Sequence, residues 1–274
     1  MAYSLFRICV VGFVLATVDG GKVAKEMFFS GLDKPLELYP FPQLPFALDA
    51  LEPHIDSATM DLHYSIIFKN HTVQLNKLLK RWRESKDKTA PVAKPSLINI
   101  WRNHKDLPEP FARDFFNHGG GYLNHLLYFS TMSPPKKNTG KKFSAKFNRI
   151  IDRSFHNATH MKSNMKRLAG EVFGSGWVYL ARAVGWMDSD YLTVIVTHEE
   201  MAPLDNPKIT PVLALDMWEH AYFMKYGASR MEYFENWWQT IDWMKVERTF
   251  NWWREFEGYS EESEFWKTLM IIFH

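Results

Sequence analysis

Apolar residues and histidines recur at helical spacing over residues 57–85. The members of one stripe lie four residues apart and have apolar neighbours on either side: His63, Ile67, His71 and Leu75, flanked by Ile66 and Leu78. A period close to 3.6 residues predicts a helix that buries this stripe.

A second helix is predicted from about residue 109 to residue 132, because Pro134-Pro135 ends it. It contains three consecutive glycines, residues 119–121, and each costs about 1 kcal/mol relative to alanine in a helix. This cost predicts that another backbone approaches closely there. Residues 86–107 contain several Lys, Asp and Pro residues and are predicted to form a connecting segment. The Pro-rich residues 22–57 are predicted to form an extended strap that leads to the first helix.

Runs rich in β-branched and aromatic residues follow at 177–182, 191–197 and 212–216, which predicts three strands. Residues 231–254 return to a helical pattern. Helices first and a small sheet later is an α+β order. Hydrophobic residues make up 46% of the 274 residues, which is ample for a packed core.

The net charge of +2 gives no overall attraction to nucleic acid. Residues 136–167 are strongly basic, with Asp152 as the single acid, but a solvated helix face is favoured over phosphate contact. Cys9 is the only cysteine, so no intrachain disulfide forms, as is typical of a reducing interior or an organelle matrix.

The apolar run at residues 8–18 has the shape of a short signal-peptide core and is too short to span a bilayer. It is free of acidic residues, as in a presequence, but poor in Arg and Ser. We expect a mitochondrial or other organellar location, with a secretory route as the alternative.

Three histidines and one aspartate are candidates for a single metal site: His63, His125, Asp216 and His220. Three imidazoles and a carboxylate suit iron, manganese or zinc better than calcium or magnesium, which prefer oxygen ligands. A histidine on an apolar stripe is more often a core residue than a ligand. Asp216, at the end of an apolar strand, has to be paired, hydrogen-bonded or metal-bound.

Five motifs around these residues follow in the order seen in iron and manganese superoxide dismutases: residues 47–55, 62–64, 124–125, 173–177 and 216–222. The chain resembles that family from about residue 36 to about residue 248. The resemblance implies an N-terminal helical hairpin packed on a C-terminal α/β domain with a small antiparallel sheet. The corresponding division is an N-terminal extension (1–35), a helical hairpin domain (36–134), an α/β metal-binding domain (135–250) and a C-terminal extension (251–274).

The resemblance further implies that the four candidates are the ligands of one iron or manganese ion, with iron favoured, and that superoxide is the substrate. Tyr64 and Asn124 adjoin the first two ligands in these motifs. Trp177 and Trp218 match the aromatic walls of the family's site. Glu219 matches the residue that reaches across the family's dimer interface to the partner's His220.

Several positions depart from the family pattern. His71 and Ile67 stand where the family has tyrosine and histidine, and Phe223 replaces a second tyrosine. A family glutamine comes from one of two positions, which here hold Gly121 and Glu200. An ionised Glu200 would be unable to donate a hydrogen bond, and its negative charge would favour the oxidised metal.

Two interpretations follow from these matches and departures. The first is a superoxide dismutase whose residues around the metal ligands are altered. The second is a catalytically weak or silent dismutase-fold subunit of a larger mitochondrial assembly, such as a ribosome or a respiratory complex. The apolar segments at residues 1–20 and 251–274 predict contact with such an assembly, and the family predicts a dimer-type contact, homomeric or heteromeric. Nucleic-acid contact is not favoured.

Overall fold

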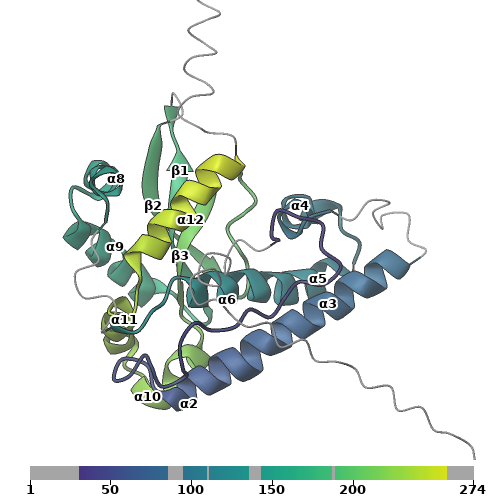
Figure 1. Cartoon of the computed structure of the whole chain (residues 1–274), viewed down its shortest axis with the longest axis horizontal. Helices are drawn as coiled ribbons and strands as arrows, with labels where there is room; N and C mark the ends of the chain where they lie inside the picture. The colour runs from purple at the N-terminus through teal and green to yellow at the C-terminus, as the bar shows by residue number, and fades with distance from the viewer. Residues whose placement is uncertain (1–30, 86–94, 110, 136–142, 187–188, 258–274) are drawn as a thin grey trace, which may run out of the picture.

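The computed structural model describes residues 31–85, 95–109, 111–135, 143–186 and 189–257. These form an N-terminal helical part and a C-terminal part built on a three-stranded sheet (Figure 1), so the predicted α+β class is confirmed. The described helices include none with the length and apolar character needed to cross a membrane. Most of the predicted N-terminal extension and residues 258–274 lie outside the described residues.

One continuous helical rod covers the first predicted helix. It consists of α2 (Ser57–Met60), the π-helical η1 (Asp61–Phe68) and α3 (Lys69–Glu84). Asp56 caps its start by accepting a hydrogen bond from the Thr59 N–H. Because a π turn is wider than an α turn, Phe68 rather than Ile67 is buried below His63. The predicted flank is therefore wrong at Ile66, which is 57% exposed.

The second predicted helix is also confirmed, again with a π-helical part. It runs through α5 (Phe111–Phe115), η3 (Phe116–Gly120) and α6 (Gly121–Ser130). The expected close approach of a backbone occurs at Gly120, where an added Cβ would lie 1.9 Å from the carbonyl oxygen of Glu200. At Gly121 the neighbour is instead the His71 ring.

The segment predicted as a plain connection holds two further elements. These are α4 (Leu97–Arg102) and the 3-10 helix η2 (His104–Asp106). The side chains of Leu97, Ile98 and Trp101 are fully buried. The prediction for residues 86–107 is therefore wrong over this part, because α4 contributes to the core.

The C-terminal part begins with α8 (Ala145–Phe155) and α9 (Ala158–Glu171), which pack on the sheet. All three predicted strands are present: β1 (Gly176–Val184), β2 (Asp190–His198) and β3 (Ile209–Asp216), in the antiparallel order β2-β1-β3. The register places Trp177 opposite Asp216. In the basic segment, Lys146 and Arg149 are exposed while Phe147 and Ile150 are buried, as expected of a solvated helix face.

Short helices follow β3 and lead to the end of the described chain. They are η5 (Glu219–Ala221), α10 (Phe223–Tyr226), α11 (Arg230–Trp238) and α12 (Trp243–Phe256). The start of the predicted C-terminal extension belongs to α12, and Trp253 is 1% exposed with its indole N–H donating to the Pro211 carbonyl at 2.8 Å. The expectation that Trp253 needs a partner surface is therefore wrong, because the chain's own core covers it.

Candidate metal centre

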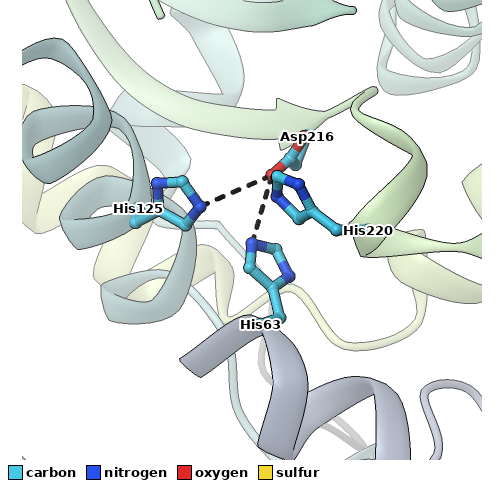
Figure 2. Close-up of side chains that lie close together, drawn as sticks. All are labelled: His63, His125, Asp216 and His220. Carbon is cyan, nitrogen blue, oxygen red and sulfur yellow. Dashed lines mark hydrogen bonds and ion pairs between the residues drawn. The ribbon is translucent and has the colours of Figure 1, made fainter. Parts of the chain in front are cut away.

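Four elements bring the four candidate side chains to one point between the helical part and the sheet (Figure 2). His63 comes from η1 and His125 from α6, whereas Asp216 ends β3 and His220 lies in η5. Their potential ligand atoms all lie within 4.8 Å of one another. The rings of His63 and His220, 157 positions apart in the printed sequence, have centroids 4.8 Å apart.

The two histidines from the helices are held as neutral rings. The Nδ1–H of His125 donates to the Gly121 carbonyl at 2.7 Å. The lone pair of Nε2 is therefore available to bind a metal ion. Burial lowers the pKa of His63 to about 4 and that of His125 well below its ordinary value. Within the described residues, the Nε2 atoms of both rings are buried without a hydrogen-bond partner.

Asp216 supplies the negative charge of the cluster and is fully buried. Its Oδ1 accepts a hydrogen bond from the Trp218 N–H at 2.7 Å, and its Oδ2 lies 3.1 Å from the Nε2 of both His63 and His220. Burial raises the pKa of Asp216, but the adjacent His220 and His63 outweigh that effect and leave the pKa below its usual range.

This arrangement fits a transition-metal ion. A buried polar atom without a partner costs about 1–3 kcal/mol. His125 Nε2 has no hydrogen-bond partner among the described residues, and His63 Nε2 has only the Asp216 carboxylate at 3.1 Å, so a cation between these atoms would satisfy both rings. Nitrogen-rich donors with one carboxylate exclude the all-oxygen shell that calcium or magnesium requires.

Comparison with known proteins identifies the family. Residues 38–133 match the model of the alpha-hairpin domain of iron/manganese superoxide dismutases, and residues 143–249 match that of their C-terminal domain. The chain belongs to the iron/manganese superoxide dismutase family. The four donors thus come in pairs from the two family domains, which are joined where the pairs meet.

Several curated members of the iron/manganese superoxide dismutase family are similar over most of their length. The chain is 34% identical over 213 residues to a protein of Listeria monocytogenes named superoxide dismutase [Mn], covering 78% of this chain and 98% of that one. It is 33% identical over 208 residues to superoxide dismutase [Mn] 2 of Bacillus cereus, covering 76% and 92%. It is 32% identical over 211 residues to superoxide dismutase [Mn] 1 of Leptolyngbya boryana, covering 76% and 78%.

Around the four donors, this family member has a layer of hydrogen-bonded side chains that the sequence analysis named. The indole N–H of Trp177 and the amide of Asn124 both donate to Glu200 Oε2, at 3.1 and 3.2 Å. The Trp177 ring also meets the His125 ring edge-on, with centroids 5.1 Å apart. These three residues therefore form one connected group against the ring of His125.

His71 lies beside the four donors. Its ring is 5.2 Å from that of His125, and its Nε2 is 3.8 Å from Glu200 Oε1. Gly121 makes room for it, since an added Cβ would lie 2.2 Å from His71 Nδ1. The His71 ring therefore fits here only because residue 121 is glycine.

The remaining named residues are Tyr64, Trp218 and Glu219, and only Trp218 lies against a donor ring. The Tyr64 hydroxyl donates to the Pro42 carbonyl at 2.6 Å and so anchors the N-terminal strap instead of facing the donors. Trp218 stacks on His220, with ring centroids 5.8 Å apart. Glu219 is exposed.

Sequence reasoning missed three tyrosines near the site. Tyr128 lies 4.9 Å from the His63 ring and shares a 3.1 Å hydrogen bond with the Tyr233 hydroxyl. The Tyr179 hydroxyl donates to Asn124 Oδ1 at 2.9 Å. Tyr128 could have been found from its position one helical turn after His125, but Tyr179 and Tyr233 carry no such local signal.

Proposed function

We propose that this protein disproportionates superoxide to oxygen and hydrogen peroxide at one iron or manganese ion held by His63, His125, Asp216 and His220. The observation that carries the proposal is the convergence of the four donor atoms within 4.8 Å, two from each family domain. The curated relatives described above are named as superoxide dismutases, which supports the same activity.

The bound ion would supply one-electron chemistry by cycling between two oxidation states. The protein residues supply the surroundings for that chemistry. The neutral rings of His63 and His125 tolerate either state, and Asp216 offsets part of the positive charge. The hydrogen bond from His125 Nδ1–H to the Gly121 carbonyl holds the ring in the orientation that ligation needs.

The enzyme is favoured over the subunit of a mitochondrial assembly, because the relatives reported above carry enzyme names and give the subunit no support. The metal stays open between the iron that the sequence analysis favoured and the manganese in the names of those relatives. A dimer-type contact near the exposed Glu219 and an organellar location remain predictions.

Metal analysis and turnover measured on the same preparation test the proposal. The full-length chain, produced with iron or with manganese, is expected to bind about one ion and to accelerate superoxide decay. His63→Ala removes a buried donor and is expected to lose both properties. His160→Ala removes an exposed histidine of α9 and serves as the matched control.

Two outcomes would refute the proposal. One is a folded wild-type protein that takes up neither metal. The other is a fully loaded protein whose superoxide turnover equals that of His63→Ala.

A further inference from the structure

Two tyrosines, Tyr128 from α6 and Tyr233 from α11, lie next to one another beside the ring of His63. Both side chains are fully buried. The Tyr128 ring lies 4.9 Å from the His63 ring, measured between centroids, and its hydroxyl oxygen lies 3.1 Å from the Tyr233 hydroxyl oxygen. The proposed function assigns no task to either phenol, although both are oxidisable groups close to a redox ion.

The hydrogen bond between these two hydroxyls allows a hydrogen atom to be exchanged. Either oxygen can act as the donor, so transfer of a hydrogen atom from one to the other restores the same bond with its direction reversed. A charge formed in this buried place would be unpaired and therefore costly. A phenol that loses an electron together with its proton becomes a neutral radical, and this avoids the cost of a buried charge.

The second tyrosine of the pair leads to further phenols. The Tyr233 ring stacks on the Tyr222 ring, with centroids 5.4 Å apart, and lies 6.0 Å from the Tyr226 ring. A radical that passes from Tyr128 to Tyr233 therefore moves from the residue that contacts His63 to a residue surrounded by other tyrosines.

We propose that Tyr128 and Tyr233 form a one-electron reserve for the metal site, which completes the reduction of hydrogen peroxide there and so spares the ligand histidines from oxidation. The inference rests on the proposed function, because that function supplies both the peroxide and the redox ion.

The electrons and protons of this step balance. Reduction of one hydrogen peroxide to two water molecules breaks the O–O bond and takes two electrons and two protons. The reduced ion is oxidised by one electron. Tyr128 gives the second electron together with its phenolic proton, and solvent gives the other proton. Tyr128 is left as a neutral oxyl radical, and the hydrogen atom of the Tyr233 hydroxyl then moves to it along the 3.1 Å hydrogen bond.

Trp177 is the rival electron donor. Its ring lies 5.1 Å from the His125 ring and 6.2 Å from the Tyr128 ring. Its indole N–H donates to Glu200 Oε2 at 3.1 Å, however, so this proton is held by a carboxyl group and not by a second oxidisable residue. The tyrosine pair is favoured because it can pass the radical on by exchange of a hydrogen atom.

Radical trapping in the iron-loaded, full-length protein tests the proposal. Iron content and superoxide turnover are determined first. The ion is then reduced, excess reductant is removed, hydrogen peroxide is added, and samples frozen within milliseconds are measured by electron paramagnetic resonance. Protein that contains ring-deuterated tyrosine distinguishes a tyrosyl from a tryptophanyl radical. The matched control is Tyr39→Phe, which removes the hydroxyl of a tyrosine that is also buried and that donates to the Lys34 carbonyl.

We expect a tyrosyl radical in the wild type and in Tyr39→Phe, and a signal at background level in Tyr128→Phe. Tyr233→Phe should keep a tyrosyl radical with an altered hyperfine pattern, because the radical then stays on Tyr128 without its hydrogen-bond partner. Peptide mapping after peroxide treatment should find several-fold more oxidised His63 in Tyr128→Phe than in Tyr39→Phe.

A tryptophanyl radical in the wild type, no protein radical, or equal tyrosyl signals in Tyr128→Phe and Tyr39→Phe overturns the proposal. If Tyr128→Phe does not fold, Tyr233→Phe decides, and an unchanged signal there overturns the proposal. A chain that takes up no iron also overturns it, while manganese content and turnover then decide the proposed function separately.

Discussion

Gly120→Ala is expected to destabilise the protein even though alanine is the better helix former. Gly120 has helical backbone angles, φ −62° and ψ −49°, so alanine meets no backbone strain there. The added Cβ, however, would lie 1.9 Å from the Glu200 carbonyl oxygen, and real Cβ contacts essentially never fall below 3.0 Å. The helix and the Glu200 backbone therefore have to separate by about 1 Å.

The magnitude follows from two opposing terms. Overpacking of this kind costs about 1–3 kcal/mol, and the better helix propensity of alanine returns about 1 kcal/mol. The net loss is up to about 2 kcal/mol, which corresponds to a fall in Tm of up to about 8 °C for a chain of this size.

Gly170→Ala provides the matched control. Gly170 is an exposed residue of α9, and its added Cβ would meet the Met231 sulfur at an ordinary 3.6 Å. This variant is expected to gain about 0.5–1 kcal/mol. Thermal unfolding of both variants with the same metal content checks the pair. A Gly120→Ala protein as stable as Gly170→Ala would refute the reasoning from close backbone approach.

Three further predictions concern pH, a buried ion pair and a buried tryptophan. Because the folded pKa of Glu200 is about 8 and the unfolded carboxyl is already ionised above pH 6.5, metal-free protein should lose up to about 1.4 kcal/mol of stability per pH unit from pH 6.5 to 8. Denaturant unfolding of Glu200→Gln should show no such fall in stability with pH, and an equal fall there would contradict the raised pKa of Glu200. Asp190→Ala removes the carboxylate that lies 2.6 Å from the Nε atoms of both Arg182 and Arg254, and should cost about 3–5 kcal/mol in urea unfolding; a loss below 1 kcal/mol would show that the pair is dispensable. Trp253→Ala removes a side chain of α12 that is 1% exposed and should cost about 3–5 kcal/mol in urea unfolding, and a loss below 1 kcal/mol would contradict its place in the core.

The sequence predicted the two long helices, the three strands and the four donors because each depends on local periodicity or on residue order. The donors lie far apart in the chain, and the recognised motifs were needed to group them. The raised pKa of Glu200 was beyond the sequence, since it depends on burial and on the charge of Asp216, which ends β3.

Other misses have equally physical origins. Helix α4 has six residues, too few for a periodic signal. Tyr64 follows a candidate ligand directly, but its hydroxyl is directed to Pro42 by the path of the strap. Trp253 was expected to contact a partner protein, because the sequence shows that this residue is apolar but does not show that β3 of the same chain covers it.

The wide turn in the rod at residues 61–68 makes chain length a design constraint. Successive residues of an α-helix are rotated by about 100°, and the π turn absorbs the equivalent of one extra residue. Making this turn regular α-helix while keeping every residue would rotate everything after it by about 100° relative to His63. Leu75 and Leu79, both now fully buried, would turn toward solvent. An engineer who idealises this helix therefore has to remove one residue between His63 and Leu75 to keep both side chains buried.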